Sequence, residues 1–164
     1  MIEVENLNKR FGNNHVLIDL NLKIDSSGIF AVLGPNGSGK TTLIKSILGI
    51  NIPNKGKISI NGEEVHSRWK YREEIQYLPQ IATFPGNLKV IELIGMIKDI
   101  RKTGSRETEL IQLFGLEPFL NKRLSNLSGG TKQKVNVVLA FMFDAPNIIL
   151  DEPTSSLTEK ETVA

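Results

Sequence analysis

Hydrophobic and polar residues alternate over the first part of the chain. Apolar positions recur along residues 2–7 and again along residues 16–24, on either side of a turn at Gly12, Asn13 and Asn14. A period of two around such a turn is typical of paired antiparallel strands. The pattern therefore predicts an N-terminal antiparallel β layer.

The pattern then changes to a short, continuous apolar run at residues 28–33. Such a run suits a strand that is covered on both faces, at the centre of a parallel sheet. Residues 43–48 follow with apolar positions at helical spacing, and Gly49 stands where a helix C-cap is expected. We predict a strand, a glycine-rich loop and a helix in that order.

Further elements are predicted downstream. Short strands are expected at residues 57–60, 75–80 and 147–150, two helices with a polar joint at 103–105 within 90–112, and another helix over 127–143. Strands that alternate with helices indicate an α/β fold.

Composition narrows the function classes. The chain has 164 residues, of which 40% are hydrophobic and 23% are charged, as expected for one globular domain. Its 20 basic and 18 acidic residues are scattered, which gives no electrostatic footprint for nucleic acid. No cysteine is present, and His15 and His66 are isolated, so disulfides and a His/Cys metal cluster are excluded.

The sequence also indicates the compartment. The N-terminus lacks the basic and apolar stretches of a secretory signal, and the most apolar stretch, residues 135–150, is interrupted by polar residues. We expect a cytoplasmic protein whose membrane role, if it has one, depends on a separate partner.

A phosphate-binding loop is predicted between the apolar run and the following helix. The segment follows the pattern of Gly, four residues and Gly-Lys-Thr, and consists of Gly34, Pro35, Asn36, Gly37, Ser38, Gly39, Lys40 and Thr41. Its glycines let backbone N–H groups converge, and the helix adds its positive N-terminal end. The ligand expected is ATP with Mg²⁺, and the alternative is a glycine-rich turn without a ligand.

Three side chains of this segment have distinct expected roles. Lys40 would reach the β and γ phosphates, and the Thr41 hydroxyl would bind the magnesium. Thr42 lies close enough to donate to a phosphate oxygen.

Two acidic residues follow the apolar strand at 147–150. An acidic pair at the carboxyl end of a central parallel strand lies beside the crevice where ligands bind in such sheets. Asp151 could hold magnesium through water, and Glu152 could act as general base for the attacking water. The alternative is a solvated strand end.

A second glycine-containing segment begins the helix at 127–143. Ser128 is placed as an N-cap, and Gly129 and Gly130 leave backbone N–H groups uncovered, which predicts a second anion site. The alternative is a simple helix cap.

With these motifs in order, the chain resembles the nucleotide-binding domains of ATP-binding cassette (ABC) proteins along nearly all of its length. Residues 34–42 resemble the Walker A loop, residues 147–152 the Walker B strand, and residues 127–131 the Leu-Ser-Gly-Gly-Gln signature, with Thr131 in place of glutamine. The resemblance implies a P-loop NTPase of the α/β class, with a mostly parallel core sheet, an N-terminal antiparallel β layer and a helical subdomain.

Two more residues receive roles through the resemblance alone. Phe11 occupies the position of the aromatic residue that stacks on adenine, and Gln80 that of the glutamine that links magnesium and water to the transmembrane partner. The alternative for Phe11 is an aromatic residue of the core, and the alternative for Gln80 is a surface position at the end of a strand. Gln80, with Glu152 and Lys40, completes the expected catalytic set.

The resemblance also implies an assembly. ATP would lie between residues 34–41 of one subunit and residues 128–130 of a second nucleotide-binding subunit. Residues 1–80 would form the β layer and P-loop core, residues 81–126 a helical subdomain that docks on an integral membrane permease, and residues 127–164 the signature helix, the Walker B strand and the start of the D-loop. The protein would be peripheral at the inner face of the cell membrane, and no nucleic-acid partner is expected.

The chain departs from the family pattern near residue 158. Thr158 stands where the family has an aspartate that crosses the dimer interface, and the sequence ends before the family's switch histidine. We therefore expect a truncated domain with exposed apolar surface beside residues 148–150.

The sequence predicts the ATPase subunit of a membrane transporter, most similar to the exporter branch of cytochrome-assembly, antibiotic-export and copper-enzyme-maturation ATPases. Two alternatives stay open: a non-hydrolysing nucleotide-binding module, and a soluble cassette protein that acts on nucleic acid or ribosomes.

Overall fold

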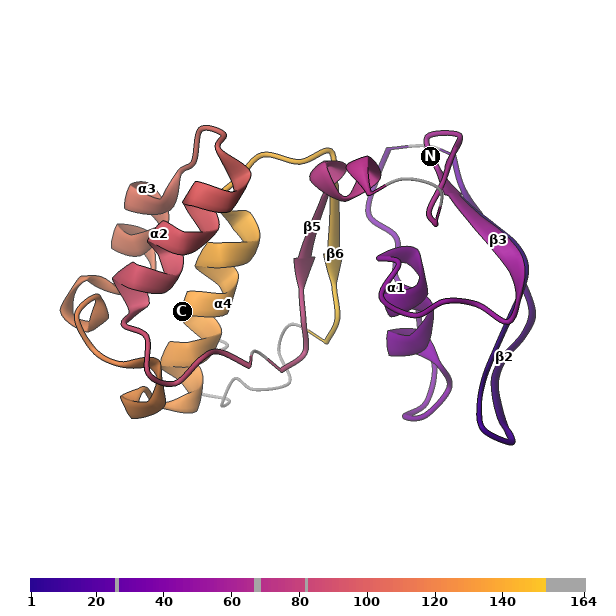
Figure 1. The fold of residues 1–164 in the computed structure, drawn as a ribbon, viewed down its shortest axis with the longest axis horizontal. Coiled ribbons are helices and arrows are strands. Elements are labelled where there is room, and N and C mark those ends of the chain that lie inside the picture. The colour runs from indigo at the N-terminus through magenta and orange to yellow at the C-terminus, as the bar shows by residue number, and fades with distance from the viewer. Residues whose placement is uncertain (26, 67–68, 82, 153–164) are drawn as a thin grey trace. The chain divides into compact units, whose positions relative to one another are not determined.

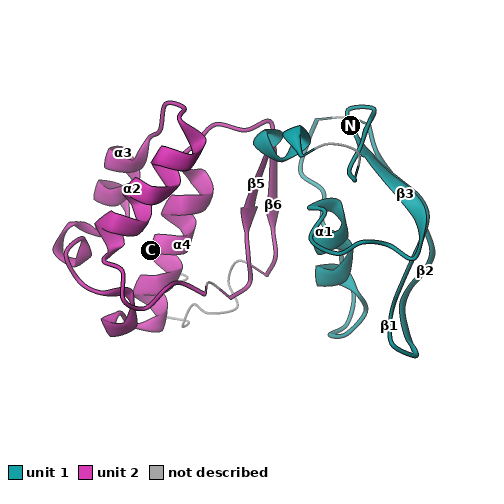
Figure 2. Ribbon diagram, viewed as in Figure 1, with its two compact units in different colours: residues 1–74 teal, residues 75–164 magenta. Residues whose placement is uncertain are grey.

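The computed structural model describes residues 1–25, 27–66, 69–81 and 83–152 (Figure 1). The chain divides into two compact units, Met1–Glu74 and Ile75–Ala164 (Figure 2), and each is described by itself. No helix in the described ranges is both long enough and apolar enough to cross a bilayer.

Unit 1 is built on an antiparallel sheet. Its strands are β1 (Ile2–Phe11), β2 (Asn14–Ile24), β3 (Lys55–Ile60) and β4 (Glu63–Glu64), in the order β2-β1-β3-β4. β1 and β2 pair from Ile2 opposite Ile24 to Phe11 opposite Asn14, so the turn lies where the sequence predicts it. The predicted N-terminal antiparallel layer is confirmed.

The core of unit 1 lies between this sheet and helix α1 (Lys40–Ile47). Val4 and Leu7 on β1 and Ile58 on β3 are buried, and the register shift between Val4 and Leu7 lets both of these side chains face inward. From α1, Leu43 and Ile47 are buried one turn apart. The helix that follows the glycine-rich loop is thereby fixed to unit 1. A short 3-10 helix, η1 (Lys70–Glu74), ends this unit.

Unit 2 combines two parallel strands with helices. β5 (Ile75–Leu78) and β6 (Asn147–Leu150) pair in parallel, and the helices are α2 (Val90–Arg101), α3 (Glu107–Leu113) and α4 (Gly129–Phe141). Short 3-10 helices occupy Glu117–Phe119 and Leu124–Asn126. The predicted strands at 75–80 and 147–150 and the predicted helices are confirmed, with small shifts at their ends.

A hydrophobic cluster holds α2, α3 and α4 together. Its fully buried members include Val90, Leu116, Val135, Val138 and Met142. At the rim, the Lys98 ammonium of α2 pairs with the Glu107 carboxylate of α3, and the Ser105 hydroxyl donates to the same carboxylate. The hydrogen bond from Lys98, followed by that from Ser105, lowers the pKa of Glu107 from its usual value.

The predicted central strand at residues 28–33 is wrong. This segment forms no strand, and the side chains of Ile29 and Leu33 are 101% and 89% exposed. A strand requires a neighbouring backbone to accept its hydrogen bonds, and the described sheet of unit 1 contains only β1 to β4. The apolar run indicates a tendency to be buried but does not specify a pairing partner.

Apolar exposure beside residues 148–150, in contrast, is confirmed. The side chains of Ile148 and Leu150 are 50% and 43% exposed on β6. Parallel pairing is limited to β5 and β6 among the described residues. The predicted subdivision at residues 80 and 126 stays a prediction.

Gly56 and Gly62 offer a matched test of the β1–β3 contact. Both have φ of +82°, but a Cβ on Gly56 would lie 2.4 Å from the backbone oxygens of Glu5 and Asn6, whereas nothing lies within 4 Å of one on Gly62. We expect Gly62→Ala to cost ~1–2 kcal/mol through left-handed backbone strain alone. Gly56→Ala should cost a further ~1–3 kcal/mol, because β1 must move away from β3.

Denaturant titration of the two variants measures this difference in the free energy of unfolding. Equal midpoints for Gly56→Ala and Gly62→Ala would contradict the close β1–β3 approach.

Candidate functional site

The glycine-rich segment 34–41 forms a tight turn that leads into α1. The Ser38 N–H donates to the Pro35 carbonyl at 3.2 Å, and the Leu43 N–H donates to Gly39 at 2.8 Å, so the helix begins directly at the loop. Gly39 has φ of +95°, and a Cβ there would lie 3.0 Å from Leu17 Cδ2. A side chain at this position would therefore meet both left-handed backbone strain and a close contact that Leu17 would have to relieve.

The Lys40 side chain folds back over this loop. Its ammonium donates to the carbonyls of Gly34, at 2.8 Å, and Pro35, at 3.0 Å. Thr41 and Thr42 occupy the first turn of α1. Residues 34–38 are exposed. The segment thus combines an accessible glycine loop, a lysine at its mouth and a helix N-terminus, which are the features that a polyphosphate requires.

Phe11 lies at the end of β1 and is 49% exposed. The Lys9 ammonium lies 4.9 Å from its ring centroid. A half-exposed ring at a strand end is not a core aromatic, so that alternative is wrong. The stacking of Phe11 on adenine stays a prediction.

In unit 2, three of the predicted residues meet where β5 and β6 end. Gln80 Nε2 donates to Glu152 Oε2 at 2.5 Å, and the Asp151 N–H donates to the Leu78 carbonyl at 2.9 Å. Parallel strands place their carboxyl ends at one edge, and the register Leu78 opposite Leu150 aligns these two ends. Residues 72 positions apart in the sequence therefore come into contact.

The two carboxylates at this edge differ in environment. The Asp151 side chain is 3% exposed, whereas Glu152 is partly exposed and has φ of +48°. A left-handed backbone is uncommon for a residue with a side chain and costs free energy. It turns Glu152 away from the strand direction, toward Gln80.

Tyr77 on β5 also belongs to this cluster. Its hydroxyl donates to Asp151 Oδ2 at 3.4 Å. Burial, together with the charge and the hydrogen bond of Asp151, raises the pKa of Tyr77 to about 12. All three causes favour the neutral phenol, which can then remain a donor to Asp151.

Sequence reasoning missed Tyr77 and Asn136. The buried Asn136 amide of α4 donates to the Pro79 carbonyl at 3.2 Å and so holds the residue before Gln80. Asn136 could have been noticed in the sequence, because it is a polar residue within the apolar pattern of its helix. The role of Tyr77 depends on the strand register, which cannot be read from the sequence.

Ser128 caps α4. Its hydroxyl oxygen accepts the Thr131 N–H at 3.2 Å and lies 2.9 Å from the Thr131 hydroxyl. The predicted cap is thus confirmed, and Thr131 takes part in it. The role of Ser128, Gly129 and Gly130 as a second anion site stays a prediction.

The predicted residues fall into two groups, one in each unit. Unit 1 holds Phe11 and residues 34–42, and unit 2 holds Gln80, Asp151, Glu152 and residues 128–130. Thr158 lies outside the described residues. Within the described ranges, no three His, Cys, Asp or Glu side chains gather as a metal site.

A family model described as ABC transporter matches residues 17–155. The uncharacterized ABC transporter ATP-binding protein YybJ of Bacillus subtilis is 36% identical over 98% of the chain and 74% of its own length. The sulfate/thiosulfate import ATP-binding protein CysA of Bradyrhizobium diazoefficiens is 32% identical over 97% of the chain, which spans 49% of that relative.

Solved structures agree with this match. The dimeric structure of MJ0796, a bacterial ABC transporter cassette, is 25% identical, with a TM-score of 0.87 over 99% of this chain and 78% of that one. A post-hydrolysis state of the same cassette, bound to ADP and Pi, gives a TM-score of 0.84 at 26% identity, over 98% and 78%. The predicted P-loop NTPase fold class is thereby confirmed.

The contact between Tyr77 and Asp151 leads us to a testable prediction about the titration of the Tyr77 hydroxyl. Because the folded-state pKa is raised from 10.0 to about 12, this group should contribute stability that is complete below pH ~10 and is lost as the pH rises toward ~12. In Asp151→Asn we expect the midpoint of Tyr77 to fall only part of the way to its usual value, because burial remains.

Carbon-13 NMR of the tyrosine rings measures the titration midpoint of Tyr77 in the unmodified protein and in Asp151→Asn. The Tyr71→Phe substitution identifies which ring signal belongs to Tyr77. An unchanged midpoint in Asp151→Asn would remove Asp151 as a cause of the shift.

Proposed function

The chain belongs to the ABC transporter family of ATP-binding domains, and on that premise we propose that it binds and hydrolyses ATP as the energy-coupling subunit of a membrane transporter. The observation that carries this proposal is the exposed glycine loop with Lys40 folded over it at the start of α1. The assignment to the exporter branch stays a prediction.

Phosphate binding would use residues 34–42. Backbone N–H groups of the loop and the N-terminus of α1 supply donors and a positive field for the β and γ phosphates. Lys40 would exchange its two carbonyl acceptors for phosphate oxygens, which a charged acceptor makes favourable. Phe11, half-exposed at the end of β1, would stack on adenine.

The oxygen donors of the predicted metal ligands suit Mg²⁺. This ion commonly takes one or two protein ligands and completes its shell with water and substrate phosphates, so a three-residue cluster is not required. Thr41, Asp151 and Gln80 are the residues that would hold it, with Asp151 acting through water. When bound, Mg²⁺ neutralises charge that develops on the phosphates.

Hydrolysis would use Glu152 as the general base. The water oxygen attacks the γ phosphorus, the bond from that phosphorus to the β,γ-bridging oxygen breaks, and the water proton passes to the Glu152 carboxylate. ADP and phosphate leave. The Gln80 amide, 2.5 Å from Glu152, orients this carboxylate, and Asn136 holds the adjoining Pro79 carbonyl.

We propose a head-to-tail dimer as the working form. Ser128, Gly129 and Gly130 would face the γ phosphate bound by the partner's loop, where the N-terminus of α4 offers uncovered N–H groups. The similar cassette MJ0796 forms a dimer in its solved structure, which supports this assembly. Each chain would then supply half of each site.

The membrane partner would dock on α2 and α3. A hollow of about 400 Å³ lies between these helices and includes Ile91, Ile94, Ile111 and Leu120 in its lining. Leu113 nearby on α3 is 70% exposed. Exposed apolar side chains around a groove suit a protein partner, here an integral membrane permease at the cytoplasmic face of the cell membrane.

Two substitutions separate binding from turnover. Lys40→Ala should abolish nucleotide binding, whereas Glu152→Gln should retain binding with ATP hydrolysis reduced on the order of a hundredfold or more. Fluorescent-nucleotide titration and phosphate release measure the two quantities. Lys45→Ala, in the last turn of the same helix, is the control for Lys40 and should change neither.

Unchanged affinity in Lys40→Ala would refute the loop's role. An unaltered rate in Glu152→Gln would count against the general base. Binding without any turnover in the unmodified protein would favour a non-hydrolysing module instead.

The docking surface has its own test. Ile91→Glu combined with Leu113→Glu should reduce retention on native-host membranes by about tenfold or more, because apolar contact is replaced by charge. ATP binding should be unaffected. Ile18→Glu, at a position on β2 that is 67% exposed, is the control.

Sedimentation with the membranes, before and after protease treatment of their cytoplasmic face, measures retention. If the double variant is retained as well as the control, or if protease treatment has no effect, a docked membrane protein at this groove is ruled out.

A further inference from the structure

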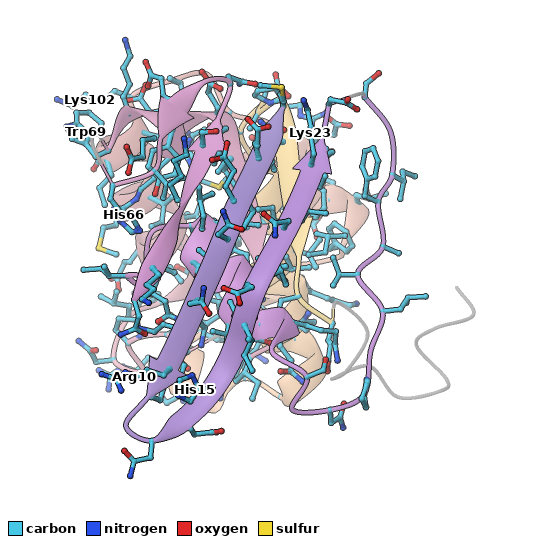
Figure 3. All side chains as sticks on the ribbon, turned by 90° about the vertical axis from the view of Figure 1, so that its right-hand side faces the viewer. Arg10, His15, Lys23, His66, Trp69 and Lys102 are labelled. Carbon is cyan, nitrogen blue, oxygen red and sulfur yellow. The ribbon has the colours of Figure 1, made fainter. Side chains whose placement is uncertain are left out.

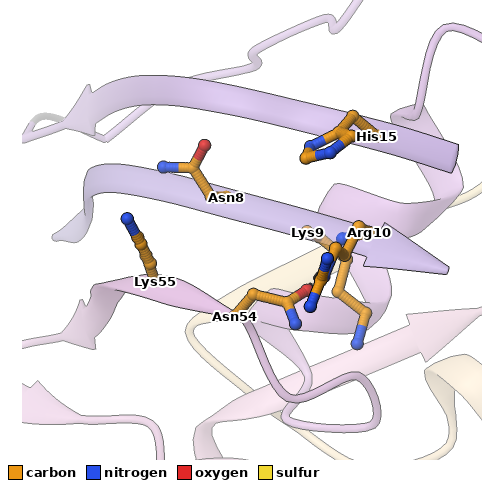
Figure 4. A pocket seen from close by; sticks show the side chains of 6 residues that line it. All are labelled: Asn8, Lys9, Arg10, His15, Asn54 and Lys55. Atoms are coloured by element: carbon orange, nitrogen blue, oxygen red, sulfur yellow. Dashed lines mark hydrogen bonds between the residues drawn. The ribbon is translucent and has the colours of Figure 1, made fainter. Parts of the chain in front are cut away.

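A second concave surface lies at the hairpin end of the unit 1 sheet. It encloses about 400 Å³ and is lined by Asn8, Lys9, Arg10, His15, Asn54 and Lys55 (Figure 4). Arg10 and His15 are labelled near the hairpin end of the sheet in Figure 3. The proposed function of the glycine loop uses none of these residues.

The strand register brings these residues together. Arg10 on β1 stands opposite His15 on β2, and Asn8 on β1 stands opposite Lys55 on β3. Three neighbouring strands therefore contribute to one hollow. The Asn54 N–H donates to the Asn8 carbonyl at 2.8 Å, which fixes the segment before β3 against β1.

The cationic groups of this hollow differ from others on the same sheet. Lys23 and Lys57 form ion pairs with Glu3 and Glu5. For Arg10 and Lys55, in contrast, no ion pair occurs within the described ranges. Among the described residues, these two positive charges are thus not paired with a carboxylate.

The other lining groups add donors or are already engaged. Lys9 donates to the Ile52 carbonyl at 2.7 Å and lies over the Phe11 ring. Asn54 Oδ1 accepts the Arg10 N–H at 2.8 Å, which leaves the Asn54 Nδ2 group as a donor. One carboxylate contacts a lining residue: Asn8 Nδ2 donates to Asp19 Oδ1 at 2.7 Å.

We propose that this hollow binds a phosphate group. The Arg10 guanidinium presents a planar fork that matches two phosphate oxygens, and the Lys55 ammonium supplies a second charge. Asn54 and His15 add N–H donors at the rim. The charges gather at one hollow rather than along a stripe, which suits a single phosphate more than a nucleic-acid backbone.

The phosphate could come from a soluble molecule or from a lipid headgroup. NMR titration with inorganic phosphate, at constant ionic strength in chloride, tests the first source. Co-sedimentation with phosphatidylcholine vesicles that contain or lack phosphatidylglycerol tests the second. Amide shifts at Arg10, His15 and Lys55 report on this hollow, and those of residues 34–41 report separately on the glycine loop.

We expect saturable shifts at the hollow with inorganic phosphate, or binding that requires phosphatidylglycerol. Arg10→Gln combined with Lys55→Gln should weaken whichever is observed by at least about tenfold, since charge-assisted hydrogen bonds are lost. Lys23→Gln combined with Lys70→Gln removes the same charge elsewhere on unit 1 and should leave binding unchanged.

Comparing the Arg10/Lys55 variant with the Lys23/Lys70 variant separates specific binding at the hollow from a general effect of charge. Loss of binding in the Arg10/Lys55 variant alone supports the site, with either source. No saturable response to either probe, or equal weakening in both variants, overturns it. Responses at residues 34–41 do not enter this comparison, so failure here leaves the ATP proposal intact.

Discussion

The parallel pairing of β5 with β6 is the constraint on which the proposed catalytic residues of unit 2 depend. A one-residue slip of either strand would turn that strand's side chains to the opposite face of the sheet. It would also separate Gln80 from Glu152, which are in contact at 2.5 Å, and Tyr77 from Asp151. The pairing is short, at four residues on each strand, and it is supported from α4. Asn136 contributes to that support because its amide binds the backbone where β5 ends.

Unit 1 depends on a different kind of constraint, the close approach of backbones. Gly39 lets the start of α1 lie against Val16 and Leu17, and Gly56 lets β3 lie against β1. Neither position has room for a Cβ without movement of its neighbours. The phosphate loop is therefore placed by the antiparallel layer beneath it, and its chemistry is supplied by its own backbone.

The sequence predicted the loop, the acidic strand end and the helix cap because each is a local pattern. Ser128 caps the helix start indicated by the following glycines, and Lys40 lies at the mouth of the loop. What it could not predict were pairings. The apolar run at 28–33 indicated a buried strand, but no partner strand lies beside it within the described part of unit 1. Tyr77 and Asp151 meet through a register of backbone hydrogen bonds that no single-sequence pattern contains.

The two carbonyl acceptors of Lys40 have a consequence for selectivity. Any anion that enters the loop must compete with the oxygens of Gly34 and Pro35 for the same ammonium. A weakly charged anion offers the lysine little more than these carbonyls already provide, whereas a triphosphate offers several charged oxygens at once. For the ATP binding proposed above, this resting contact would favour a triphosphate over small, weakly charged anions at Lys40.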